Sequence, residues 1–141
     1  MLDEIWVRDC MTREVITCSY DTLMEEVVAE LQDRMFSCLV ISEDSKPIGI
    51  ITERDLVSIF SDLLDNQAWK HLLVADYMTK NPKTLYEDLT LLEAVDLMRI
   101  DKIRHAPVVN SQGELVGILT QTDVVKGFYN AFVNGALDNC Q

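Results

Sequence analysis

The sequence contains the same segment twice, and this repeat constrains the fold more than any other feature. Three stretches of the first half recur in the same order in the second half. They pair as 7–17 with 74–84, 22–41 with 90–109, and 47–60 with 115–128. The offset is 67 residues before the first long helix and 68 after it, which indicates a one-residue insertion near Asp88–Leu89.

The repeat predicts two structural units of the same design. We expect the repeat cores at 7–60 and 74–128, separated by a helix tail and linker at 61–73. The corresponding domain boundaries are 1–66 and 67–141.

Each copy predicts the element order β-α-β-β-α. Thr22 and Thr90 have the position of helix N-caps, because Glu25 and Glu93 follow at the capping-box spacing. Short apolar stretches bounded by polar turns predict strands. The expected strands are 39–41 and 48–52 in the first copy and 107–109 and 115–120 in the second, and the closing helices are 53–64 and 121–133.

One copy of about 55 residues buries too little surface to be stable by itself. We therefore expect the two β-α-β-β-α repeats to pack sheet to sheet, with pseudo-two-fold symmetry and a shared core. The fold class is α/β, in the α+β sense.

Composition excludes several classes of function. The chain has 24 acidic and 12 basic residues, a net charge of −12, which argues against a nucleic-acid backbone as partner. No apolar stretch reaches the length of a membrane span, and MLDEIW at the N-terminus lacks the basic start of a signal peptide. We expect a cytoplasmic protein without a membrane partner. The four cysteines and two histidines show no spacing typical of a disulfide framework or a metal site.

The junctions GIITERD and GILTQTD have the same Thr-x-x-Asp pattern where a strand meets a helix. Thr52 and Thr120 stand at the helix start, where unpaired N–H groups favour a phosphate. Asp55 and Asp123 offer only acceptors, so one carboxylate can take both hydroxyls of a ribose.

The same pattern has a purely structural interpretation. Thr-x-x-Asp is close to a capping box, and acidic side chains in the first turn stabilise a helix by themselves. The residues alone leave both interpretations open.

The duplicated pattern resembles a tandem pair of CBS (cystathionine-β-synthase) domains, often called a Bateman module. The resemblance covers residues 7–60 and 74–128 and depends on DCMT and DYMT, on APVV, and on the two junctions. It implies a regulatory module that binds adenosine-type ligands in clefts between the repeats, in many members as a disc-shaped homodimer.

The resemblance also implies two sets of ligand-binding residues. The first comprises Thr17 with the backbone near Val15 and Ile16, the segment from Ser37 to Leu39, and the residues Thr52, Arg54 and Asp55. The second comprises Lys83, Thr84, His105, Ala106, Pro107, Thr120, Thr122 and Asp123.

The two sets differ where the second copy has Arg104, His105, Ala106 and Pro107. The alignment places Phe36, Ser37, Cys38 and Leu39 opposite them, without the base or the proline. The second set therefore matches the family pattern more closely, and we expect it to form the better ligand site, with the first either empty or occupied by a different ligand.

We expect no enzyme, because neither a nucleophile motif nor a Walker loop is present. The leading hypothesis is a sensor of AMP, ADP, ATP, S-adenosylmethionine or NAD, with no obligatory cofactor, that relays occupancy to an unknown effector. The alternatives are a ligand-free dimerisation scaffold and a module that senses divalent cations.

The helices at 53–64 and 121–133 are apolar over a face wider than the stripe of a surface helix, which predicts that they are buried in a homodimer interface.

Overall fold

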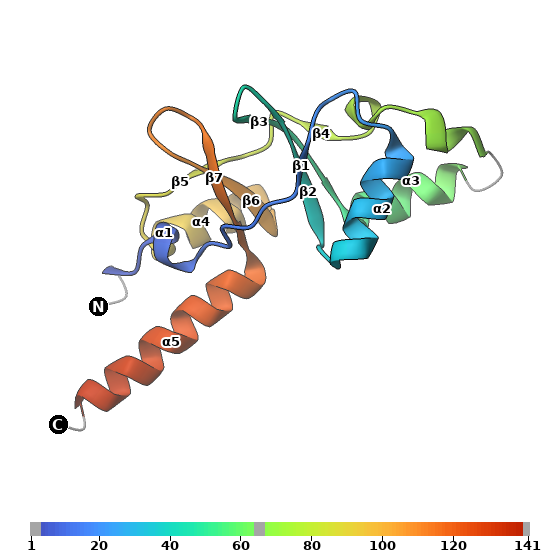
Figure 1. The fold of residues 1–141 in the computed structure, drawn as a ribbon. Helices are drawn as coiled ribbons and strands as arrows, with labels where there is room; N and C mark the ends of the chain where they lie inside the picture. Colours follow the sequence, from blue (N-terminus) through green and yellow to red (C-terminus); the bar gives the residue numbers. More distant parts are fainter. Residues whose placement is uncertain (1–3, 64–66, 140–141) are drawn as a thin grey trace. The chain divides into compact units, whose positions relative to one another are not determined.

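The computed structural model describes residues 4–63 and 67–139, without the side chains of 62–63, 67–68 and 136–139. These residues fold into two compact units, each with its own sheet (Figure 1). Unit 1 consists of the described parts of 1–14 and 83–141, and unit 2 consists of 15–82. The chain is thus a mixed α/β protein, as the sequence predicts.

Unit 2 has a four-stranded sheet in the order β1-β2-β3-β4, in which only β1 and β2 run parallel. Two helices pack on this sheet, and short 3-10 helices η2 and η3 follow them. The elements are β1 (Thr17–Cys18), α2 (Met24–Arg34), β2 (Cys38–Glu43), β3 (Lys46–Thr52), α3 (Glu53–Leu63), η2 (Gln67–His71), η3 (Val74–Asp76) and β4 (Thr79–Lys80).

The core of unit 2 follows from the two periodicities of its elements. Val27 and Leu31 lie one turn apart on α2, and Leu39 and Ile41 alternate along β2, so that each pair faces the same way. All four are less than 5% exposed. At about 1.5–3 kcal/mol for each fully buried side chain, this contact fixes α2 on the sheet.

Unit 1 has the same plan with a three-stranded sheet in the order β5-β6-β7. The pair β5 and β6 is parallel, and β6 and β7 are antiparallel. The elements are α1 (Val7–Cys10), β5 (Leu85–Tyr86), α4 (Leu91–Asp101), β6 (His105–Val109), β7 (Leu115–Thr120) and α5 (Gln121–Asn139). Val7 and Met11 of the N-terminal segment lie in the same core as Leu91 and Leu119.

The segment that begins each repeat therefore closes the unit formed by the other repeat. Thr12 pairs with Ile118 in unit 1, with N–H···O distances of 2.8 and 2.9 Å. Thr79, 67 residues later, pairs with Ile50 in unit 2. The compact units thus divide the chain differently from the repeats in the sequence.

The sheet registers correct the position of the insertion. Cys38 pairs with Thr52 as His105 pairs with Thr120, so the offset is still 67 in β2 and β6 and becomes 68 only in β3 and β7. The extra residue lies in the second copy's turn, at 110–114, and not near Asp88–Leu89 as predicted.

This shift also corrects one of the two expected helix caps. Thr90 is the N-cap of α4, and its hydroxyl accepts from the main-chain N–H of Glu93 at 3.2 Å. The N-cap of α2 is Leu23, which has no side-chain cap, so the prediction for Thr22 is wrong. With the correct offset of 67, Leu23 and not Thr22 is the counterpart of Thr90.

The closing helices begin where the sequence predicts, and α5 continues to Asn139. Their apolar residues are only partly covered: Leu56 is buried, but Val57, Tyr129 and Phe132 are more than 60% exposed. Leu64, the expected end of the first helix, lies outside the described residues. Sheet-to-sheet packing with pseudo-two-fold symmetry stays a prediction.

Among the described residues, no helix has the length and apolar character of a membrane span.

Candidate functional site

In unit 2 three strand ends meet at one edge of the sheet. The chain enters β1 at Ile16, whose carbonyl oxygen accepts from Val40 at 3.0 Å. It enters β2 after Ser37, whose carbonyl oxygen accepts from Glu53, just beyond the last residue of β3, at 3.0 Å. Because neighbouring strands lie about 4.8 Å apart, the three ends span only about 10 Å. The fold thus brings together the segments that hold most of the first predicted set.

Asp55 is half-buried one turn into α3 and turned back onto the end of β3. Its Oδ2 accepts from the main-chain N–H of Thr52 at 2.9 Å and from the Thr52 hydroxyl at 3.0 Å. The N–H of Asp55 donates to the same hydroxyl oxygen at 3.2 Å. This is a reciprocal capping box. Its Oδ1 has no hydrogen-bond partner among the residues that the structure describes.

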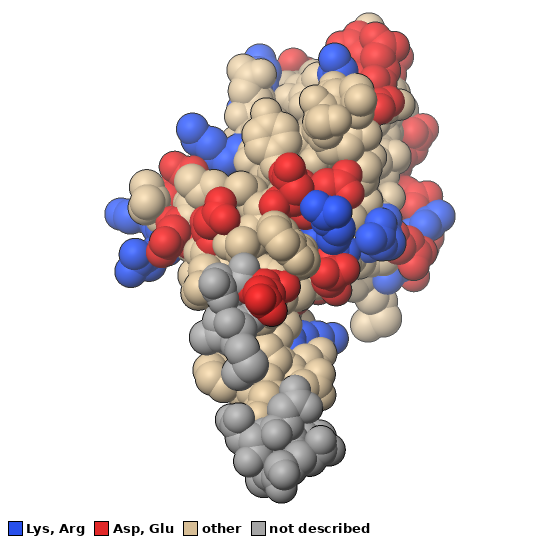
Figure 2. Space-filling model, turned by 90° about the vertical axis from the view of Figure 1, so that its left-hand side faces the viewer, with Lys and Arg blue, Asp and Glu red and all other residues tan. Residues whose placement is uncertain are grey.

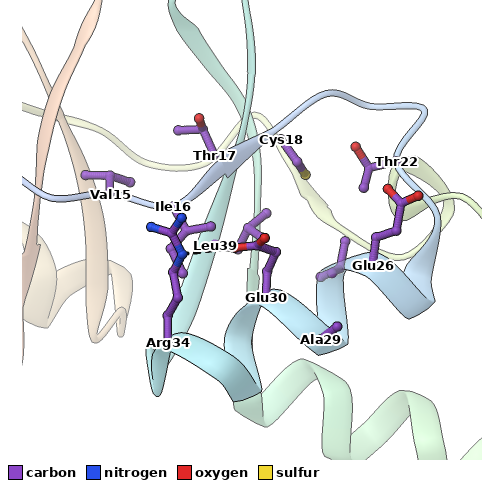
Figure 3. Close-up of a pocket in the computed structure, with 11 residues that line it drawn as sticks. Val15, Ile16, Thr17, Cys18, Thr22, Glu26, Ala29, Glu30, Arg34 and Leu39 are labelled. Atoms are coloured by element: carbon purple, nitrogen blue, oxygen red, sulfur yellow. Dashed lines mark ion pairs between the residues drawn. The ribbon is translucent and has the colours of Figure 1, made fainter.

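A hollow of about 590 Å³ lies in unit 2 between β1 and α2 (Figure 3). Its lining includes Thr17 and Leu39 of the predicted set and the segment of Val15 and Ile16. The other lining residues are Cys18, Thr22, Glu26, Val27, Ala29, Glu30 and Arg34. Such a volume is within the range of small-molecule sites.

The charged residues that line this hollow all come from α2, and the sequence interpretation missed them. Glu30 and Arg34 point from α2 toward the segment of β1, and Arg34 Nε lies 3.1 Å from Glu30 Oε2 (Figure 3). Their i,i+4 spacing was the available signal. The pKa of Cys18 is raised, mainly by burial, so this thiol adds no charge at neutral pH.

Unit 1 repeats the strand-end arrangement with the second predicted set. His105 at the start of β6 pairs with Thr120 at the end of β7, and Thr84 immediately precedes β5. The N–H of Gln121 donates to the Arg104 carbonyl at 3.0 Å, as Glu53 does to Ser37 in unit 2.

Asp123 makes a contact that Asp55 lacks. Its Oδ2 accepts from the main-chain N–H of Thr120 at 3.0 Å, and its own N–H donates to the Thr120 hydroxyl. In addition, the hydroxyl of Thr12 donates to Oδ1 at 3.0 Å and to Oδ2 at 3.1 Å. Thr12 was not among the expected site residues, although Met-Thr recurs in both copies.

The remaining predicted residues divide by exposure. Arg54, Lys83 and Thr122 are exposed, while Ala106 and Pro107 are buried. The register also corrects the matching of the two sets: Cys38 occupies the place of His105, and Val40 that of Pro107. The difference noted in the sequence remains, because neither is a base or a proline.

A second hollow, of about 500 Å³, lies at the opposite end of the unit 1 sheet. Its lining residues are Arg8, Tyr86, Glu87, Asp88, Asn110 and Ser111. None of them belongs to the predicted sets, and Arg8 Nε already donates to the Glu87 carbonyl at 3.4 Å.

The face of the molecule drawn in Figure 2 has no basic stripe. Figure 2 shows Lys and Arg in separate groups among Asp and Glu on the face drawn. No group of three or more His, Cys, Asp or Glu side chains in the described ranges is placed to hold a metal ion.

Comparison with known proteins agrees with this duplicated architecture. The sequence pattern of the CBS domain matches twice, at residues 7–62 and 74–130. The chain is a tandem pair of CBS domains. The CBS pair is 33% identical over 121 residues to protein MK0525 of Methanopyrus kandleri, covering 85% of this chain and 61% of that protein. It is 37% identical over 112 residues to inosine-5'-monophosphate dehydrogenase of Korarchaeum cryptofilum, covering 79% of this chain but only 22% of the enzyme.

Two solved structures have the same fold over most of this CBS pair. CBSX2 from Arabidopsis thaliana, solved in complex with AMP, has a TM-score of 0.76 and 26% identity, and the match covers 90% of this chain and 98% of that one. The CBS domain pair of protein MJ0100, solved with 5-methylthioadenosine and S-adenosyl-L-methionine, has a TM-score of 0.75 and 25% identity, with coverage of 87% and 98%.

Proposed function

We propose that this CBS pair is a regulatory module, not an enzyme, that binds an adenosine-type ligand at the strand ends that hold Asp55 and Asp123. The ligand class is AMP, ADP, ATP, S-adenosylmethionine or NAD. In each site the aspartate takes the ribose hydroxyls, and the N–H groups at the start of α3 or α5 take a phosphate or the equivalent part of the ligand.

The observation that supports this proposal is the recurrence of one strand-end geometry in both units. In each, a Thr N–H holds the aspartate Oδ2 at 2.9–3.0 Å, which aims the carboxylate at the edge where three strand ends converge. In unit 2 this edge adjoins a hollow lined by Thr17 and Leu39. The complexes of CBSX2 with AMP and of MJ0100 with two adenosyl compounds favour the same ligand class.

Occupancy must alter the conformation if it is to regulate a partner. We propose that the output is an effector domain or protein in the same cytoplasmic compartment. The match to about a fifth of an inosine-5'-monophosphate dehydrogenase fits a module that is attached to varied partners.

A homodimer is the proposed assembly. Val125, Tyr129, Phe132 and Val133 follow one another on α5 at spacings of four, three and one, which places them on one face of the helix. They are 67, 66, 63 and 39% exposed, so this face is available for a second copy. The dimer does not by itself require a ligand, and it is the second candidate function.

Thermal unfolding with a ligand panel tests the proposal. The panel contains AMP, ADP, ATP, S-adenosylmethionine and NADH, with magnesium chloride alone in a separate well. A true ligand at 100 times its Kd adds about 2.7 kcal/mol to the free energy of unfolding, which raises the Tm. A shift with magnesium alone would favour cation sensing, and no shift at all would favour the dimerisation scaffold.

The binding variants must preserve the helix caps. Asp55→Asn and Asp123→Asn keep an oxygen for the main-chain N–H of Thr52 or Thr120 but replace the second acceptor with donors. If the double variant keeps its fold and its ligand response, the aspartates are not the ribose site.

A further inference from the structure

The two candidate aspartates differ in how many of their oxygens are already engaged. Both oxygens of Asp123 have a donor: the Thr12 hydroxyl lies 3.0 and 3.1 Å from Oδ1 and Oδ2, and the Thr120 N–H lies 3.0 Å from Oδ2. The donors on Asp55 both come from Thr52, and both reach Oδ2. Over the described ranges, Asp55 Oδ1 has no donor.

The difference comes from one pair of equivalent threonines. Thr12 pairs with Ile118 as Thr79 pairs with Ile50, so Thr79 occupies in unit 2 the place of Thr12 in unit 1. Thr12 is half-buried and reaches Asp123. Thr79 is exposed and, within the described part of unit 2, makes no hydrogen bond to Asp55.

We propose that Thr12 sets the order in which the two sites fill, by occupying the acceptor that a ribose needs on Asp123. This inference rests on the proposed function. A hydroxyl that donates to a carboxylate makes a charge-assisted hydrogen bond, so a ribose hydroxyl at Asp123 must share the oxygen with this donor or displace it, and it gains less than at an oxygen without a donor. At Asp55 the free oxygen accepts a ribose hydroxyl without that exchange. Unit 2, whose sheet also carries the hollow beside Thr17, therefore fills first, which reverses the order expected from the match of the second set to the family pattern.

Single-site proteins measure this order with AMP as the probe in isothermal titration calorimetry. Asp123→Asn leaves the unit 2 site and Asp55→Asn leaves the unit 1 site. We expect the Asp55→Asn protein to bind AMP about tenfold more weakly, the effect of one hydrogen bond that is weakened or broken. Equal affinities, or tighter binding at unit 1, would overturn the proposal.

The role of the hydroxyl is isolated by substitution at the two equivalent threonines. In the Asp55→Asn background, Thr12→Val removes the hydroxyl at nearly constant volume and should tighten AMP binding about tenfold. Thr12→Ser retains the hydroxyl and should leave binding weak. In the Asp123→Asn background, Thr79→Val should change the Kd by less than about twofold, because Thr79 makes no hydrogen bond to Asp55 in the described part of the chain.

Other results are equally decisive. If Thr12→Val weakens binding in a protein with a normal unfolding transition, Thr12 supports the site and does not compete for it. If Thr12→Val does not fold, Thr12→Ala is measured in the same way. If AMP binds, and Thr12→Val and Thr79→Val change its Kd equally, only the filling order is overturned. If AMP binds neither to the wild type nor to any variant, the proposed function for AMP is overturned, and this inference with it.

Discussion

The sulfur of Met11 lies over Gly117, so that a Cβ built on this glycine would be 2.7 Å from it. The same Cβ would be 2.9 Å from the carbonyl oxygen of Thr12, which belongs to the main-chain pair with Ile118. The absent side chain at Gly117 thus makes room for the N-terminal segment that closes unit 1.

We predict that Gly117→Ala destabilises the protein by about 1–3 kcal/mol, because the Thr12 main chain cannot move without breaking its pairing. Gly49→Ala is the matched control. The three atoms nearest to a Cβ on Gly49 would all belong to the side chain of Met78, which can rotate away, so its cost should be smaller. Urea denaturation measures both; a larger loss for Gly49→Ala would show that the main-chain contact is not the limiting one.

Thr90→Ala should lower the free energy of unfolding by about 1 kcal/mol, because the Thr90 hydroxyl caps α4 by accepting from Glu93 N–H at 3.2 Å. Thr22→Ala should cost less, since the N-cap of α2 is Leu23. The midpoints of urea unfolding compare the two variants. Equal losses would mean that the cap of α4 contributes no more than an ordinary threonine.

High pH should destabilise unit 2 through Cys38. Burial raises the pKa of this thiol from 9.0 to about 12. Between these two values the unfolded chain loses the proton while the folded chain keeps it, so this contribution to stability is complete below pH 9 and is lost as the pH rises toward 12. The slope approaches about 1.4 kcal/mol per pH unit.

The control for this prediction is Cys38→Ala, which removes the thiol while the tyrosines and lysines that also titrate above pH 9 remain. The difference between the two unfolding free energies is measured from pH 8 to pH 11. A difference that does not change with pH would contradict the assignment to Cys38.

Tyr129→Glu should convert the proposed dimer to monomer, because it places a charge in the exposed apolar face of α5. Asn130→Glu adds the same charge at the next exposed position, off the line of Val125, Tyr129 and Phe132, and should leave the dimer intact. Size-exclusion chromatography with light scattering gives the mass of each protein. A monomeric wild type would rule out this interface.

Periodicity and repetition predicted the elements well because they report local chemistry. The strand at 115–120 and the start of α5 after Thr120 agree with the structure. The cap was assigned to Thr22 because a glutamate follows it at the capping-box spacing. The N-cap of α2 is instead Leu23, one residue later.

The exchange of the starting segments could not be read from the sequence. DCMT and DYMT share the Met-Thr pair, and in both units the methionine of this pair lies against a glycine, Gly117 or Gly49, so this part of the pattern does not distinguish the two pairings. The contact of Thr12 with Asp123 depends on that pairing and was missed for the same reason. The lining of the hollow by α2 was missed because Glu30 and Arg34 also suit an ordinary solvated helix.

Each unit contains the starting segment of the other repeat, and this exchange has a consequence for truncated forms of the chain. A fragment that keeps a single repeat loses the starting segment that lies on its glycine in the whole chain, Met11–Thr12 on Gly117 or Met78–Thr79 on Gly49. Cutting the chain between the repeats therefore leaves each half without a piece of its own compact unit, so neither half is expected to fold as a smaller version of the whole.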